Sequence, residues 1–121
     1  MSKNQNSKQY DLEERTFRFA QRVRQFVKKL PKTIANIEDI KQLVKASGSV
    51  GANYIEANES LSKKDFVYRI KVCRKESKES RYFLRLVDTG NDSNLENERK
   101  DLIQEATELM KIFGSIITKS E

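Results

Sequence analysis

Residues 45–58 read KASGSVGANYIEAN and place two glycines, Gly48 and Gly51, inside a stretch that otherwise has the composition of a long helix. Glycine in a helix interior costs about 1 kcal/mol relative to alanine. Two glycines within four residues are therefore expected where a neighbouring helix packs tightly against the backbone and recovers that loss. The stretch predicts a helix that another helix approaches closely at its middle.

The composition of the whole chain favours helices. The 121 residues include one proline and four glycines, with 35% charged and 36% hydrophobic side chains. This length suits a single domain, and this profile is typical of long amphipathic helices joined by short loops. We expect an all-α protein with a polar, disordered tail at residues 1–10 and one domain at residues 11–118.

Apolar residues recur at spacings of three and four in four segments, which is the periodicity of amphipathic helices. The segments begin at candidate N-caps, namely Asp11, Asn36, Ser62 and Ser93. Four helices with short connections predict an antiparallel up-down four-helix bundle. The inward positions expected are Leu12, Thr16, Phe19, Val23, Phe26 and Leu30; Ile37, Ile40, Val44, Ser47, Gly51 and Tyr54; Phe66, Ile70, Cys73, Ser77, Ser80, Leu84 and Val87; and Leu95, Leu102, Ala106, Leu109, Phe113 and Ile116.

Small and polar residues gather halfway along the second and third predicted helices. Antiparallel packing brings these two centres level, so we expect close contact there, with Asn53 and Glu56 hydrogen-bonding across helices rather than touching a substrate. The predicted helix-packing motif consists of Ser47, Gly48, Gly51, Asn53, Glu56, Ser77 and Ser80.

Further apolar residues flank the predicted seams. Such an excess is typical of a subunit interface, so we expect a homo-oligomer; alternatively, the residues broaden the core of a single chain. They are Phe17, Ala20, Val27, Val67, Ile103, Met110 and Ile117.

Basic residues form two rows at helical spacing. Rows of this kind bind the phosphates of nucleic acids, because each contact releases condensed counterions. Alternatively, they form salt bridges with acidic residues of the fourth helix, namely Glu96, Glu98, Asp101, Glu105 and Glu108. The row on the third helix is Lys71, Arg74, Lys75, Lys78, Arg81 and Arg85; the row on the first is Arg15, Arg18, Arg22 and Lys29.

The sequence offers little for catalysis. It contains no histidine, which removes the commonest general base and the Glu-x-x-His pairs of di-iron bundles. Cys73 is the only cysteine and falls on a seam, where a small packing role is expected. We therefore expect no catalytic residue, no metal, no cofactor and no small-molecule substrate. The lone cysteine and the lack of an apolar N-terminal segment or membrane span favour a cytoplasmic protein.

The motifs on the second and third helices resemble a bacterial four-helix bundle family. That family includes the proteins encoded by intervening sequences within 23S ribosomal RNA genes and resembles the accessory variability proteins of diversity-generating retroelements. The similarity runs from Tyr10 to Ile117 and is carried by residues 49–57 (SVGANYIEA), 62–66 (SKKDF) and 74–80 (RKESKES). In the family motif Ser-Ile-x-x-Asn-Ile-Ala-Glu-Gly, Ser49, Asn53 and Glu56 correspond, whereas Tyr54, Ile55 and Ala57 depart.

The resemblance implies an antiparallel bundle that assembles as a ring, commonly a homopentamer, with a basic surface that contacts RNA or a ribonucleoprotein partner and with no known catalysis. Our prediction is a non-enzymatic, homo-oligomeric protein that binds RNA or an RNA-binding protein through the two basic rows. The alternative is a structural assembly or adaptor protein whose charges serve solubility and helix pairing.

Overall fold

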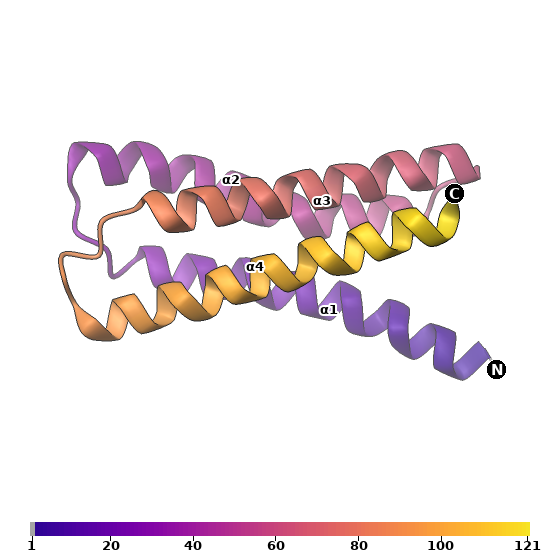
Figure 1. Cartoon of the computed structure of the whole chain (residues 1–121), viewed down its shortest axis with the longest axis horizontal. Coiled ribbons are helices and arrows are strands. Elements are labelled where there is room, and N and C mark those ends of the chain that lie inside the picture. The colour runs from indigo at the N-terminus through magenta and orange to yellow at the C-terminus, as the bar shows by residue number, and fades with distance from the viewer. Residues whose placement is uncertain (1) are drawn as a thin grey trace.

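The structure is a computed structural model that describes residues 2–121, with side chains described from Leu12 onward. Its four helices are α1 (Ser2–Val27), α2 (Ile34–Asn58), α3 (Lys63–Leu86) and α4 (Ser93–Ser120), and no strand occurs among the described residues. Figure 1 shows the helices side by side along one long axis, with successive helices running in opposite directions. The predicted all-α, antiparallel four-helix bundle is confirmed.

Each helix packs against two others. The most extensive contacts are those of α3 with α2 and α4, whereas α1 packs on α2 and less extensively on α4. Because α1 and α3 make no direct contact, they lie at opposite corners of the bundle. The α1–α2 and α3–α4 loops lie together at one end, and the α2–α3 loop lies at the other (Figure 1).

The start of α1 differs from the prediction. The helix begins at Ser2 and runs through Asp11, so the predicted cap at Asp11 is wrong. The side chains of residues 1–11 lie outside the described part of the structure. The disordered tail predicted for residues 1–10 therefore stays a prediction.

Of the other three predicted N-caps, one is confirmed and two are wrong. The Ser62 side chain accepts a hydrogen bond from the Asp65 amide, as expected for the N-cap of α3. For α2 the cap is Thr33 rather than Asn36, and for α4 it is Asp92 rather than Ser93. The N-cap predicted at Ser93 is therefore wrong, because the Asp92 side chain accepts from the Leu95 amide.

The core contains the predicted seams of α1, α3 and α4. Every inward position expected on the first helix is buried, and on α3 only Phe66 stays partly exposed. On α4 the partly exposed position is Ile116, next to the buried Ile117. The hydrophobic effect over this shared core is what holds the four amphipathic helices together.

The buried face of α2 is rotated from the predicted one. Ile37 is 42% exposed, and Ile40 and Val44 pack only partly against the core. The buried positions are instead Asn36, Leu43, Ala46, Ser47, Val50, Tyr54 and Ala57. The predicted α2 seam is therefore wrong at Ile37, partly buried at Ile40 and Val44, and right at Ser47 and Tyr54.

Gly51 lies where α1 approaches α2 closely. A Cβ atom built at Gly51 would lie 2.9 Å from Oγ1 and 3.3 Å from Cβ of Thr16 on α1. Thr16 is fixed in place, because its hydroxyl donates to the carbonyls of Leu12 and Glu13 at 2.9 Å each. The neighbour that requires a glycine is thus α1, not the serine centre of α3.

Asn36 joins the two loops at one end of the bundle. Its side-chain nitrogen donates to the carbonyls of Pro31 (2.9 Å) and Asp88 (2.8 Å), and its Oδ1 accepts from the Asp88 amide at 2.8 Å. The α3–α4 loop then turns through Gly90 and Asn91, both in the left-handed region, with Pro31 packed beside Gly90. A buried amide with all these bonds made ties the loops together.

The flanking apolar residues divide between the core and the surface. Val27 and Ile117 are buried within a single chain, whereas Phe17 remains 56% exposed. Burial of Val27 and Ile117 inside one chain leaves Phe17 as the main flanking residue available for a subunit contact.

Across the described residues, none of the helices is long and apolar enough to cross a membrane.

Candidate nucleic-acid interface

The basic row on α3 lies along the side of that helix that faces α4. Arg81 marks the side, because its Nη1 lies 3.5 Å from Oγ1 of Thr107 on α4. Arg74 lies over the same seam, with its Cδ 4.0 Å from a Cβ built at Gly114. Lys71, Lys78 and Arg85 share this helical face and are exposed.

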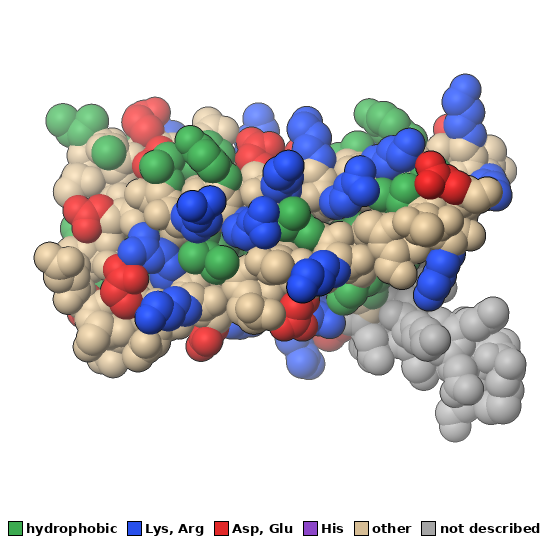
Figure 2. Space-filling model, viewed as in Figure 1, with side chains coloured by type: hydrophobic (Ala, Val, Ile, Leu, Met, Phe, Trp, Pro, Cys, Tyr) green, Lys and Arg blue, Asp and Glu red, His purple; other side chains and the backbone are tan. Residues whose placement is uncertain are grey.

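Helix α4 adds two cations to the same surface. Lys100 and Lys111 are exposed and lie seven residues before and four residues after Thr107, so they share its side of the helix. Figure 2 shows the front of the molecule, formed by α3 and α4, with basic side chains gathered over it and apolar ones between them. We call this surface the basic face; it comprises Lys71, Arg74, Lys78, Arg81, Arg85, Lys100 and Lys111.

Lys75 is the one member of the predicted α3 row that faces elsewhere. It lines a small cleft of about 190 Å³ between α2 and α3, together with Lys45, Glu76 and Glu79. Burial raises the pKa of Glu76, and the nearby charge of Glu79 raises it further. This mixture of two cations and two carboxylates is a poor site for a phosphate.

No residue of the basic face forms a salt bridge among the described residues. Every ion pair in that part of the chain joins α1 or the α1–α2 loop to α4, or lies within α1, α2 or α4. The carboxylates of α4 that pair with other elements point to α1 and the loop that follows it, as in the pairs Arg15–Glu105 and Lys29–Glu98. The third helix therefore presents cations beside the neutral and basic side of α4.

In the row predicted on the first helix, unlike the row on α3, two of the arginines form ion pairs with carboxylates. Arg15 binds Glu105 through two nitrogens at 2.8 and 2.9 Å and Glu108 at 2.9 Å. Arg18 pairs with Glu14 on its own helix at 3.1 Å. Because α1 and α3 occupy opposite corners of the bundle, the structure does not bring the two predicted rows onto one surface.

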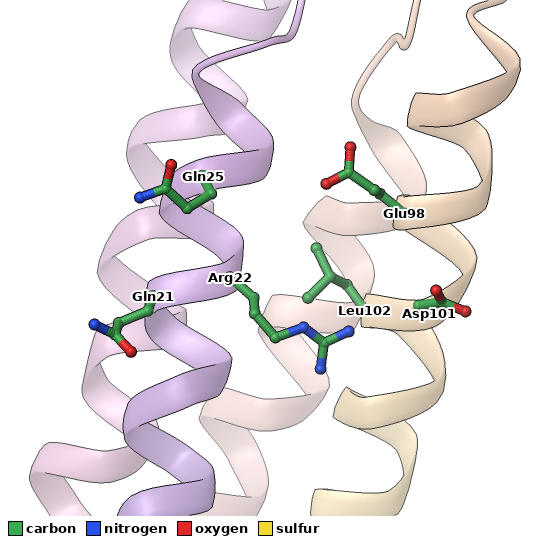
Figure 3. A pocket seen from close by; sticks show the side chains of 6 residues that line it. All are labelled: Gln21, Arg22, Gln25, Glu98, Asp101 and Leu102. Atoms are coloured by element: carbon green, nitrogen blue, oxygen red, sulfur yellow. The ribbon is translucent and has the colours of Figure 1, made fainter.

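Arg22 lines a cleft of about 510 Å³ between α1 and α4. Figure 3 shows its guanidinium pointing from α1 toward α4, where Glu98, Asp101 and Leu102 lie, with Gln21 and Gln25 on the α1 side. Two carboxylates beside one guanidinium make this cleft unfavourable for a polyanion.

The Arg15 cluster predicts a measurable contribution to stability. Arg15→Met should lower the free energy of unfolding by about 1 kcal/mol at pH 7, because it leaves the partly buried Glu105 carboxylate without its two charge-assisted bonds. Arg18→Met, in an exposed pair, should cost less than about 0.5 kcal/mol. Urea unfolding of both variants measures this difference, and equal stability of the two would contradict the assignment.

The same cluster has a definite pH dependence. Hydrogen bonds from Gln104 and then Arg15 hold the pKa of Glu108 below its ordinary value. A carboxylate with a lowered folded pKa contributes stability above its unfolded pKa of about 4.3 and loses it as pH falls through the folded value. The Arg15→Met deficit should therefore shrink when unfolding is repeated at about pH 3.

The chain is similar to known proteins over most of its length. The sequence model of the 23S rRNA-intervening sequence protein family matches residues 8–115. The chain belongs to this family. It is also similar to a protein of unknown function from the S23 ribosomal protein family of Bacteroides thetaiotaomicron VPI-5482, known from a crystal structure. The two share 27% identity with a TM-score of 0.75, over 87% of this chain and 96% of the other. No curated protein matches the chain.

Of the three positions that correspond to the family motif, only Asn53 bonds from α2 to α3 among the described residues, so the bond across helices predicted for Glu56 is wrong. Oδ1 of Asn53 accepts from Nη1 of Arg69 on α3 at 2.9 Å, and its nitrogen donates to the carbonyl and the hydroxyl of Ser49 at 2.9 Å. The contact with Arg69 is a bond across helices. Glu56 is exposed and lines a cleft with Arg69 at the α2–α3 loop.

The remaining residues of the predicted packing motif lie at helix contacts. Ser47 is buried on α2, and Gly48 lies beneath the flexible guanidinium of Arg24, 3.0 Å from a Cβ built there. Ser77 and Ser80 are buried, and their hydroxyls donate to carbonyls one turn earlier on α3 at 2.8 Å. They therefore make no side-chain hydrogen bond to α2.

The described residues hold no group of His, Cys, Asp and Glu side chains that could bind a metal. Burial raises the pKa of Cys73 to about 12, and its thiol lies 3.4 Å from the Val50 carbonyl. A thiol in that state is a packing group rather than a nucleophile.

Lys100 and Lys111 are the candidate site residues that sequence reasoning missed. By total charge the fourth helix is acidic, since residues 91–121 carry seven acidic and four basic side chains. Sorting those charges by helical face places Lys100 and Lys111 on the side that faces α3, whereas Glu98, Glu105 and Glu108 lie on the side that faces α1. That periodicity is the signal that finds them.

Proposed function

We propose that this protein acts by binding rather than by catalysis and that it binds RNA through the basic face. The observation that carries the proposal is the contrast between the two basic rows. Arg15 of α1 and Lys29 of the α1–α2 loop form salt bridges with carboxylates of α4, whereas no residue of the basic face forms one among the described residues. Cations without partners retain their attraction for an external polyanion.

The geometry suits an RNA backbone. Lys71 and Arg85 lie fourteen residues apart on one helix, so the row extends roughly 21 Å at 1.5 Å per residue. Each lysine or arginine that contacts a phosphate releases counterions, which supplies affinity without a reading of sequence. The row is long enough to contact several consecutive nucleotides.

We further propose that the protein is cytoplasmic and assembles with copies of itself, with a pentameric ring favoured by the resemblance described above. The exposed Phe17 is a candidate for the subunit contact. A ring would present several basic faces to one RNA, and linked weak contacts give a much higher overall affinity than any single one.

Charge reversal on the basic face tests the proposal. Lys71→Glu combined with Lys78→Glu should weaken binding of a fluorescently labelled RNA hairpin with single-stranded flanks by at least about tenfold at 0.1 M salt. The plot of log affinity against log salt should become shallower by about 1.4, because two phosphate contacts on unpaired strands are lost. Fluorescence anisotropy over a salt series measures both quantities.

The matched control is Lys28→Glu combined with Lys41→Glu, which makes the same change in net charge at exposed positions away from the basic face. This variant should bind nearly as the wild type, with circular dichroism showing both variants folded. Equal weakening by the two pairs would show that only net charge matters. Absence of RNA retention at micromolar wild-type protein would overturn the proposal in favour of an assembly or adaptor protein.

A further inference from the structure

An aromatic ring stands exposed beside the basic face. The Tyr82 side chain on α3 is 56% exposed. Its ring meets that of Phe83 edge-on, with centroids 5.1 Å apart and planes at 86°. Phe83 itself is partly buried against the core. The edge-on contact holds the tyrosine ring in place while leaving much of it open to solvent.

Tyr82 lies between two cations of the basic face. Lys78 is four residues before it and Arg85 three residues after it, and residues at these spacings are neighbours on a helix surface. Glu79, three residues before Tyr82, lies on the other side of the ring, where it lines the cleft between α2 and α3. A nucleotide in a strand has a phosphate on either side of its base and sugar. A base stacked on Tyr82 would therefore place its two flanking phosphates toward Lys78 and Arg85.

The other exposed tyrosine of α3 has different surroundings. Tyr68 is 61% exposed, but it lines a cleft with Glu56, Glu59 and Asp65. The guanidinium carbon of Arg69 lies 5.8 Å from the centroid of its ring. Its neighbours repel phosphate and its own ring already contacts a cation, so exposure alone does not make an aromatic residue suitable for a base.

The basic face thus combines a row of cations with one held aromatic ring, which is the combination that single-strand binding proteins use. Bases inside a duplex are covered by their neighbours and are not available to a ring that projects from a helix. We infer that the basic face takes unpaired RNA and that Tyr82 is the position on which a base stacks. This inference rests on the RNA binding proposed above and names its class of ligand.

A tryptophan placed at Tyr82 reports stacking directly. The chain has no tryptophan, so Tyr82→Trp introduces a single tryptophan at the proposed contact, which can be excited selectively over the remaining tyrosines. Titration with an unstructured 12-nucleotide RNA should quench its emission, whereas heparin, a polyanion without bases, should bind and leave the emission nearly unchanged. Tyr68→Trp is the matched control and should show little quenching by the same RNA.

The RNA affinities of variants that contain no tryptophan give an independent measurement. Tyr82→Leu should weaken binding of the 12-nucleotide RNA by at least about fivefold while changing affinity for heparin less than twofold. Tyr82→Phe keeps the ring and should bind nearly as the wild type, and Tyr68→Leu should be without effect. These comparisons use the full chain and do not depend on the tryptophan variant folding.

The outcomes separate the two proposals. Quenching confined to Tyr82→Trp, together with the loss in Tyr82→Leu, supports the stacking position. Charge-dependent RNA binding that is unaffected at Tyr82, or that prefers a 12-base-pair RNA duplex to the single strand, overturns the present inference and leaves RNA binding by the basic face standing. Failure to bind RNA of either form overturns both.

Discussion

Gly51→Leu should lower the melting temperature by roughly 8 °C or more. The β-carbon alone would lie 2.9 Å from Oγ1 of Thr16 and 3.6 Å from its backbone carbonyl carbon, so α1 must shift to admit the side chain. Overpacking of this kind costs about 3 kcal/mol, of which better helix propensity returns about 0.8 kcal/mol. At roughly 4 °C per kcal/mol for a chain of this size, the net loss gives the stated shift.

Gly114→Leu is the matched control for that experiment. Gly114 is also inside a helix, but the nearest atom to a Cβ built there is Cδ of Arg74 at 4.0 Å, on a flexible side chain. This variant should be as stable as the wild type or more stable, because the helix gains propensity without a close neighbour. Thermal denaturation followed by circular dichroism compares the two. A Gly51→Leu protein that melts with or above Gly114→Leu would show that α1 does not approach α2 as described.

A double-mutant cycle tests whether Gly51 and Thr16 are the two residues in contact. Thr16→Ala removes the hydroxyl oxygen that lies nearest to a Cβ atom built at Gly51, so it should relieve part of the cost of Gly51→Ala. We expect the double variant to be at least about 1 kcal/mol more stable than the sum of the single effects predicts. Strict additivity would place the source of the destabilisation elsewhere.

How far the sequence predicts this fold differs from helix to helix. The seams of α1, α3 and α4 follow directly from periodicity, because large apolar residues occupy the buried positions and polar ones the surface. On α2 the same rule favours Ile37, Ile40 and Val44, although the buried face begins with Asn36 and Leu43. A rule that ranks residues by hydrophobicity cannot prefer an asparagine to an isoleucine one position away.

The glycines show a similar limit. Their presence inside a helix predicts a close neighbour, and Gly51 has one, but local sequence does not identify the helix that supplies it. Sequence favours the serines of α3 as that neighbour, because they are small and occur at the matching height. In the structure Thr16 of α1 takes that place, and the α3 serines satisfy their hydroxyls within their own helix.

For the candidate site, sequence spacing found the basic row on α3 but could not tell it from the row on α1. Both rows recur at three and four residues, and both have acidic residues of the fourth helix as possible partners. The distinction comes from the order of helices around the bundle, which places the carboxylates Glu98, Glu105 and Glu108 toward α1. Which row stays unpaired is thus a property of tertiary arrangement.

Asn36→Ala should lower the free energy of unfolding by about 2–4 kcal/mol. Asn36 is 1% exposed, and its amide group makes three bonds to the Pro31 carbonyl and to the carbonyl and amide of Asp88. Truncation leaves these backbone groups buried without their partners, at about 1–3 kcal/mol for each group that water cannot reach. Asn97→Ala, at an exposed position on α4, should change stability by less than about 0.5 kcal/mol.

Hydrogen exchange shows where in the structure Asn36→Ala lowers stability, which is as informative as the size of the loss. The Asp88 amide donates to Oδ1 of Asn36, so its hydrogen exchange should accelerate at least tenfold in Asn36→Ala beyond the change at core amides of α3. Asn36→Asp keeps the acceptor but turns its second oxygen toward the carbonyls of Pro31 and Asp88, so it should also destabilise the protein at pH 7. If exchange at Asp88 follows only the global loss of stability, Asn36 does not join the loops. If it accelerates locally, the Asn36 side chain ties the α3–α4 loop to the start of α2, across 52 residues of sequence.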